Sequence, residues 1–120
     1  MADHTTYGLV CSELSEDLSK TNLGELELDS FQKNSVKIKI KAASLNFPDL
    51  LMTQGKYQNK PNLPFALGME GAGIVEKIGS EVSSLKEGDE VMFGGWGHGA
   101  IAESIILPEG LVSLKPKSLN

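Results

Sequence analysis

The sequence predicts a mainly β domain, in which short and mostly antiparallel strands form a partly open barrel or a sandwich, together with one or two short helices (an α+β composition). Apolar and polar residues alternate along several short segments, as they do in strands with one buried face. Glycine, proline, asparagine and aspartate separate these segments, and 13 of the 120 residues are glycine, which indicates many turns. One further segment has the pattern of a helix instead.

The clearest strand is SVKIKIKAASL, residues 35–45. Its apolar residues and its lysines alternate, so they are expected on opposite faces: Val36, Ile38 and Ile40 on one, Lys37, Lys39 and Lys41 on the other. Weaker alternation predicts further strands at residues 7–14, 24–31, 71–78, 90–93, 100–107 and 111–114. The single cysteine, Cys11, lies in the first of these and is expected to be a small buried hydrophobic side chain.

Residues 46–57, NFPDLLMTQGKY, predict a helix of about two turns. Asn46 is a capping-type residue, Pro48 falls in the first turn, and Gly55 stands where the helix would stop. The apolar side chains of this segment are expected first to be core, with the lining of a substrate pocket as the alternative: Phe47, Leu50, Leu51 and Met52.

Length and composition indicate one globular domain over residues 1–120, with residues 1–6 disordered. The net charge of −5, without a basic cluster, argues against a nucleic acid or an anionic membrane as a partner. The first residues lack a basic start followed by an apolar run, and no segment approaches the about 18 apolar residues that span a bilayer, so a cytoplasmic location is expected.

A dinucleotide-binding fold would need G-x-G-x-x-G between a strand and a helix. The segment GGWGHGA, residues 94–100, comes closest, but it misses the third glycine and precedes a predicted strand. We therefore expect no Rossmann nucleotide-binding domain within these residues. His98, in this loop, is expected to be solvated, with a proton shuttle as the alternative.

Four segments, residues 42–57, 64–82, 85–93 and 99–108, together resemble the N-terminal GroES-like catalytic domain of the medium-chain dehydrogenase/reductase superfamily. They are most similar to its zinc-independent NADPH:quinone oxidoreductase branch. The resemblance implies a GroES-like, alcohol dehydrogenase-like N-terminal domain. Gly68, Glu70, Gly73 and Gly79 fall at the intervals that follow a Gly-His-Glu motif in the zinc alcohol dehydrogenases of the superfamily.

The histidine of that motif is Met69 here, and the family's first zinc ligand, a cysteine, corresponds to Asn46. A catalytic zinc needs about three protein ligands, and a thioether is a poor one, so no zinc is expected. Two interpretations of Met69 stay open: it packs near the cleft, or it fills core space in a glycine-rich turn. The carboxylate of Glu70 is expected to be partly buried and bonded to main-chain N–H groups, in a structural role.

The resemblance also implies the site residues. Asn46 and Tyr57 are the catalytic candidates, as hydrogen-bond or proton donors to the oxygen that gains charge during reduction. The alternatives are a simple helix cap for Asn46 and an aromatic side chain at a surface groove for Tyr57. Cofactor contacts are expected from Asn46 and Pro48, and substrate contacts from Phe47, Leu51, Met69 and Trp96.

The function that follows is the catalytic-domain portion of a zinc-independent NADPH-dependent oxidoreductase, inactive in isolation. Its partner would be a small hydrophobic electrophile (a quinone, an enone or an enoyl thioester, which all present a similar polarised alkene). NADPH is expected only with a complete Rossmann domain, so self-association or a separate nucleotide-binding chain is also expected. The alternative is a stand-alone GroES-like module that binds a ligand or a protein without catalysis.

Overall fold

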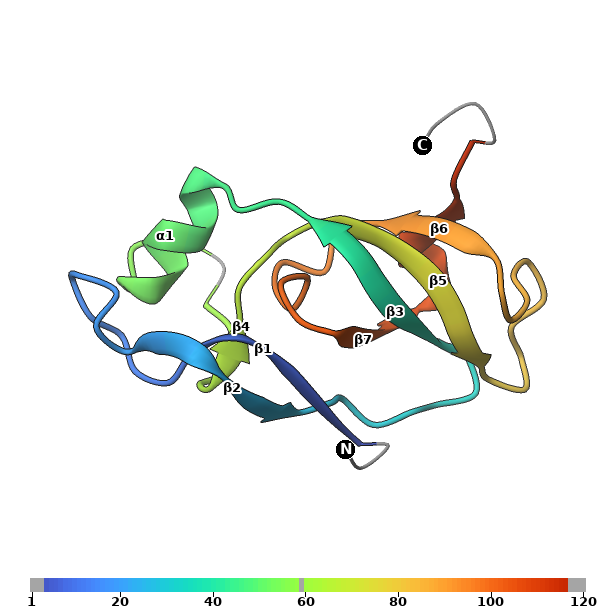
Figure 1. Cartoon of the computed structure of the whole chain (residues 1–120), viewed down its shortest axis with the longest axis horizontal. Coiled ribbons are helices and arrows are strands. Elements are labelled where there is room, and N and C mark those ends of the chain that lie inside the picture. Colours follow the sequence, from blue (N-terminus) through green and yellow to red (C-terminus); the bar gives the residue numbers. More distant parts are fainter. Residues whose placement is uncertain (1–3, 59, 117–120) are drawn as a thin grey trace.

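The computed structural model describes residues 4–58 and 60–116, which form two antiparallel sheets and one α-helix (Figure 1). The elements in chain order are β1 (Thr5–Cys11), β2 (Thr21–Glu27), β3 (Ser35–Ala43), α1 (Phe47–Thr53), β4 (Phe65–Ala66), β5 (Gly71–Ile78), β6 (Glu90–Phe93), β7 (Ser104–Pro108), the 3₁₀ turn η1 (Glu109–Leu111) and β8 (Val112–Leu114). None of the helices in this part of the chain is long and apolar enough to cross a membrane.

One sheet has the strand order β2-β1-β4 and the other the order β7-β3-β5-β6-β8. The segment before β7 joins them, because it runs beside β1: the Leu9 N–H donates to the Ile101 carbonyl at 2.9 Å, and the Glu103 N–H donates to the Tyr7 carbonyl at 2.9 Å. The result is the mainly β architecture that the sequence predicts, with the described strands paired antiparallel and one short α-helix beside them.

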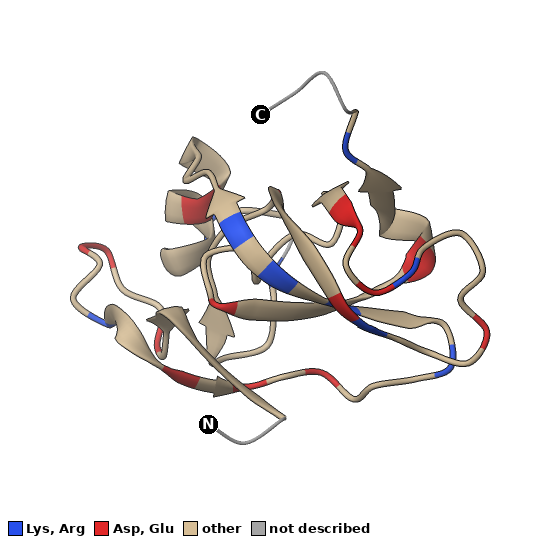
Figure 2. Cartoon of the chain, turned by 45° about the vertical axis from the view of Figure 1, so that its right-hand side comes forward, with Lys and Arg blue, Asp and Glu red and all other residues tan. Residues whose placement is uncertain are grey.

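The larger core lies under the five-stranded sheet, and β3 supplies its centre as predicted. Val36 and Ile38 are completely buried, whereas Lys39 and Lys41 on the opposite face are exposed. Figure 2 shows basic residues as blue bands on the strands of this sheet. Other buried members come from the neighbouring strands and loops: Val75, Leu85, Val91, Phe93, Ala100, Ile105, Leu107 and Val112. Burial of each such large side chain contributes about 1.5–3 kcal/mol, so this core carries much of the fold's stability.

A smaller core lies between α1 and the three-stranded sheet. Its buried members are Cys11, Met52, Phe65 and Leu67, which we call the α1 cluster. The predicted burial of Cys11 is confirmed, since the side chain has no exposed surface. The sequence did not predict β4, because two residues are too few to show alternation; this strand exists through its pairing with β1.

Two expectations are corrected at the strand ends. The disorder expected for residues 1–6 does not hold for Thr5 and Thr6, which belong to β1 and pair with β2, while residues 1–3 lie outside the described part. Thr6 is buried and its hydroxyl accepts a hydrogen bond from the Ser104 N–H at 3.0 Å. The second strand begins at Thr21 and not at Gly24, because β1 supplies partners along its whole length.

A matched pair of glycines tests the close approach of β3 and β5. A Cβ added at Gly73 would overlap the Lys39 carbonyl oxygen, whereas a Cβ added at Gly24 would meet nothing within 4 Å. We expect Gly73→Ala to lower the free energy of unfolding by about 2 kcal/mol or more, because the backbone of β3 or β5 must move to make room for the added Cβ. Gly24→Ala is expected to change it by less than about 0.5 kcal/mol. Urea unfolding measures both, and equal effects would contradict the described packing.

Candidate functional site

The site begins at α1, whose ends are those predicted. Asn46 is the N-cap residue and Pro48 lies in the first turn. At the other end Gly55 has a φ of +72°, in the left-handed region that glycine adopts without strain. The Lys56 N–H then donates to the Leu51 carbonyl at 2.9 Å. A helix of 7 residues is thereby closed at both ends, which fixes where the residues before and after it lie.

Asp49 connects the start of α1 to the glycine-rich turn before β5. Its carboxylate is completely buried. One oxygen, Oδ2, accepts a hydrogen bond from the Asn46 N–H at 2.8 Å, and the other, Oδ1, accepts one from the Gly68 N–H at 2.9 Å. Gly68 has a φ of +102°, and a Cβ there would meet the Ile101 N at 2.7 Å. The carboxylate therefore holds two separate backbone segments in one arrangement.

This arrangement corrects the expectation for Glu70. A buried carboxylate bonded to main-chain N–H groups does exist at this turn, but it belongs to Asp49, while Glu70 is exposed. Asp49 is not among the site residues predicted from the sequence. The burial of Asp49 could have been predicted from its place in the sequence, three positions after the N-cap. An acidic side chain at that position can accept a hydrogen bond from the N–H of the N-cap residue.

A row of polar side chains continues from the N-cap. The Asn46 amide Nδ2 donates to the Ser44 hydroxyl at 3.2 Å, and the Ser44 hydroxyl donates to Glu70 Oε1 at 3.4 Å. The row borders an open hollow of about 610 Å³, where β3 ends and β5 begins. The hollow is lined by Ala42, Ala43, Ser44, Glu70, Gly71, Ala72, Met92, Phe93, Gly94, Leu111 and Ser113. We call it the Ser44–Glu70 hollow; it combines apolar walls with a few polar groups at one rim.

The other candidate residues around α1 differ in how far they are buried. Tyr57 and Met69 are half-buried and both pack against the α1 cluster, Tyr57 from beyond the C-terminal end of the helix. Leu51 is half-buried, as is Pro48, whereas Phe47 is 69% exposed. Asn46 and Tyr57 thus stand at opposite ends of α1, and neither lines the Ser44–Glu70 hollow. Their catalytic assignment stays a prediction.

Trp96 lies in a different place from the candidates around α1. It lines a second hollow together with His98, and the two rings meet edge to face with their centroids 6.4 Å apart. His98 was expected to be solvated, but it is half-buried, because Phe65 packs on its other side with a centroid distance of 6.2 Å. Burial lowers the pKa of His98 from its ordinary value, and the nearby carboxylate of Asp29 opposes that effect.

Within residues 4–58 and 60–116, no group of three or more His, Cys, Asp or Glu side chains is placed to hold a metal ion. At the two positions that the resemblance matches with zinc ligands, the chain offers an amide, in Asn46, and a thioether, in Met69. Neither type of donor suits zinc.

Comparison with known proteins establishes the family. Residues 32–117 match the alcohol dehydrogenase GroES-like domain, and the chain belongs to that family. Its relatives include a quinone oxidoreductase-like protein 2 homolog of Nematostella vectensis, 34% identical over 93% of this chain and 30% of the relative. A 2-methylene-furan-3-one reductase of Solanum lycopersicum is 36% identical over 98% of this chain and 31% of the relative.

Among solved structures, a quinone oxidoreductase of Pseudomonas syringae pv. Tomato DC3000 is similar, with a TM-score of 0.87 and 32% identity over 96% of this chain and 35% of that protein. The human synaptic vesicle membrane protein VAT-1 homolog-like protein has a TM-score of 0.86 at 32% identity, over 97% of this chain and 37% of its own. The chain therefore spans about a third of the length of these relatives. The predicted resemblance to quinone oxidoreductase-like members of the medium-chain superfamily is confirmed.

Substitution of Asp49 tests the connection between α1 and the turn. Asp49→Asn leaves one acceptor oxygen for two N–H groups and turns an NH₂ group toward the other, so we expect a loss of about 2–3 kcal/mol in the free energy of unfolding. Glu81→Gln is the control, because it removes an exposed carboxylate from a loop and is expected to cost less than about 0.5 kcal/mol. Chemical denaturation compares them; an Asp49→Asn variant as stable as Glu81→Gln would refute the connection.

A pH titration tests the burial of His98. Because burial lowers the pKa of the folded ring, the unfolded chain binds a proton more readily. Stability is therefore undiminished above about pH 6.5 and falls as the pH drops from there toward the folded pKa. We expect an NMR midpoint for the His98 ring below about 6.5, and a weaker pH dependence of thermal stability in His98→Gln. A midpoint above that value would show that the ring is not buried as described.

Proposed function

We propose that this chain forms the substrate-side catalytic domain of an NADPH-dependent, zinc-independent reductase for quinones or similar conjugated carbonyl compounds. The observation that carries the proposal is the polar row from Asn46 through Ser44 to Glu70 at the rim of the Ser44–Glu70 hollow. Two relatives support the substrate class, since one is named a quinone oxidoreductase and the other a reductase of a methylene-furanone.

Reduction of a conjugated carbonyl adds a hydride to carbon and a proton to the resulting anion. NADPH supplies the hydride when it is bound. The chain supplies hydrogen-bond donors for the oxygen on which negative charge develops, and such donors are a large source of catalysis. We assign this role to the Asn46 amide, which donates to Ser44 at the rim of the hollow. The Tyr57 phenol stays a predicted proton donor, because it lies beyond the other end of α1.

The Ser44–Glu70 hollow suits the nicotinamide end of NADPH and not its diphosphate. Its apolar walls and its serine and carboxylate groups match a nicotinamide ring with a carboxamide, which both donates and accepts hydrogen bonds. Its lining contains no Lys or Arg to hold a diphosphate. In the proposal the diphosphate binds to a nucleotide-binding domain outside these residues, so the 120-residue chain alone binds NADPH weakly and does not turn over.

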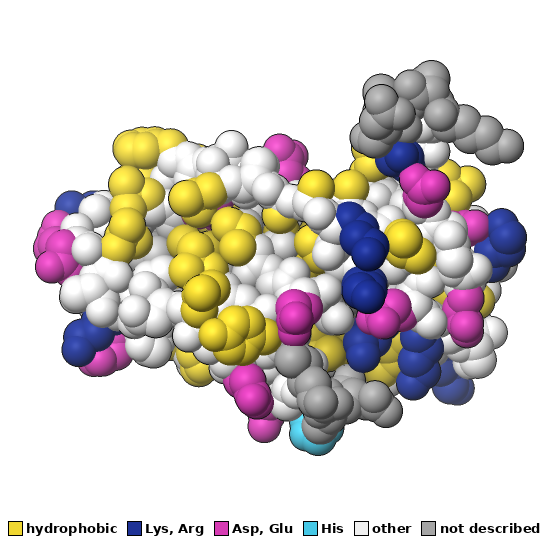
Figure 3. All heavy atoms as spheres, in the orientation of Figure 1, with side chains coloured by type: hydrophobic (Ala, Val, Ile, Leu, Met, Phe, Trp, Pro, Cys, Tyr) yellow, Lys and Arg dark blue, Asp and Glu magenta, His cyan; other side chains and the backbone are white. Residues whose placement is uncertain are grey.

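The same region has the apolar surface that a neighbouring domain would cover. Leu45 is 62% exposed and Phe47 is 69% exposed, immediately on either side of Asn46. Figure 3 shows hydrophobic side chains gathered over α1 and the adjoining part of this face. We propose that a nucleotide-binding domain contacts this surface, either in a longer protein or on a separate chain, because the similar solved structures are about three times as long as this chain.

The proposal is tested with reduced nicotinamide mononucleotide, which carries the nicotinamide without the second nucleotide. Added to the ¹⁵N-labelled chain, it is expected to shift the amide signals of Ser44, Glu70 and Gly71. Asn46→Ala is expected to weaken this binding about threefold to tenfold, because the Ser44 hydroxyl at the rim of the hollow loses the amide that donates to it. Asn22→Ala, on exposed β2, is expected to leave the binding unchanged. Incubation of the chain with NADPH and a quinone is expected to give no sustained NADPH oxidation.

Shifts confined to other parts of the chain, or an Asn46→Ala variant that binds as Asn22→Ala does, would contradict the assigned site. Sustained NADPH oxidation would contradict the need for a nucleotide-binding domain.

A further inference from the structure

A second hollow, of about 240 Å³, has no residue of α1 in its lining and takes no part in the proposed reaction. The loops that carry Asp29, Asn62 and Trp96 surround it, and β4 and β7 supply part of its wall. None of Asn46, Tyr57 and Met69 lines it. Its ligand therefore does not follow from the function proposed above.

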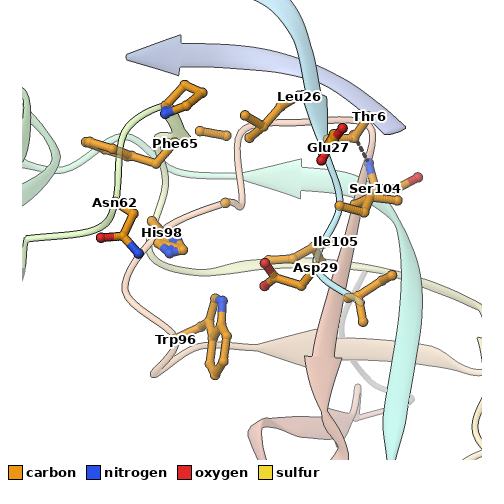
Figure 4. A pocket seen from close by; sticks show the side chains of 15 residues that line it. Thr6, Leu26, Glu27, Asp29, Asn62, Phe65, Trp96, His98, Ser104 and Ile105 are labelled. Atoms are coloured by element: carbon orange, nitrogen blue, oxygen red, sulfur yellow. Dashed lines mark hydrogen bonds between the residues drawn. The ribbon is translucent and has the colours of Figure 1, made fainter. Parts of the chain in front are cut away.

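Aromatic rings form one side of this hollow. His98 packs between Phe65 and Trp96, with centroid distances of 6.2 Å and 6.4 Å. Phe65 is only 3% exposed, so its ring is held by the core, whereas Trp96 is 38% exposed and can be covered further by a ligand. Figure 4 shows His98, Trp96 and the side chain of Asp29 around the same space.

The charged side chains that line this hollow are acidic. Its lining residues include two carboxylates, Glu27 and Asp29, and no Lys or Arg. Among the ion pairs of the described residues, neither carboxylate has a partner. Burial favours the neutral form of the His98 ring by lowering its pKa, so His98 adds little positive charge near neutral pH. A ligand with a positive charge would thus find two uncompensated negative groups beside an aromatic wall.

We propose that this hollow binds a small organic cation, an alkylammonium or quaternary ammonium group, against Trp96 and beside the carboxylate of Asp29. A cation over an indole face is attracted by the ring's negative charge distribution, and the Asp29 carboxylate adds a direct ionic attraction. A bare metal ion fits less well, because no three metal-ligating side chains converge among the described residues and aromatic carbon does not ligate metal ions.

The test uses choline chloride and its neutral carbon analogue, 3,3-dimethylbutan-1-ol, with sodium chloride at equal ionic strength. Trp96 is the single tryptophan of the chain, so its fluorescence reports on a ligand that binds beside it. We expect a saturable change in Trp96 fluorescence with choline, and none with the alcohol or the salt. An equal response to choline and to the neutral alcohol, or no saturable response to choline, would overturn the proposal.

Two variants distinguish binding at this hollow from a nonspecific attraction of choline to the negative charge of the chain. Asp29→Asn is expected to raise the dissociation constant for choline about threefold or more. Glu81→Gln removes the same unit of charge from an exposed loop and is expected to leave the dissociation constant unchanged. Both substitutions fall on exposed residues, and circular dichroism verifies that the fold is retained. If the two variants bind choline with the same affinity, the attraction is not specific to Asp29 and the proposal fails.

Discussion

The buried carboxylate of Asp49 is the interaction on which the arrangement of the site depends. It has no exposed surface and uses both oxygens, one for the N–H of Asn46 and one for the N–H of Gly68. A buried charge is costly unless hydrogen bonds satisfy it, and two N–H groups leave each oxygen with a donor. Because Gly68 lies 19 residues along the chain from Asp49, this one side chain sets the position of α1 against the turn before β5.

The site follows from that connection. With α1 fixed, Asn46 stands beside Ser44 at the end of β3, and the turn that holds Gly68 leads directly to Glu70 on the other side of the same hydroxyl. The half-buried side chains of Tyr57 and Met69 rest on the α1 cluster, which lies between the helix and the three-stranded sheet. A short helix has little stability of its own, so its place is set by its packing and by Asp49.

Much of the fold could be predicted from the sequence, because its signals are local. Alternation along residues 35–43 identified the central strand and its buried face, and the Asn46 cap with Gly55 identified the helix. The strand β4 and the full length of β2 could not be predicted, since both depend on pairing with β1. The same limit explains why the expectations for Glu70 and His98 were wrong. The burial of Asp49 in place of Glu70, and the packing of His98 between two rings, depend on contacts with segments that are distant in the sequence.

Amide hydrogen exchange at Asn46 and Gly68 tests the central role of Asp49 most directly. Both N–H groups lie outside regular strand pairing and donate to the same buried side chain. Because one carboxylate must move to release either of them, the account predicts that both amides exchange slowly and with similar protection, as a single cooperative unit. Rapid exchange at both positions, at the rate of an unprotected loop, would contradict it.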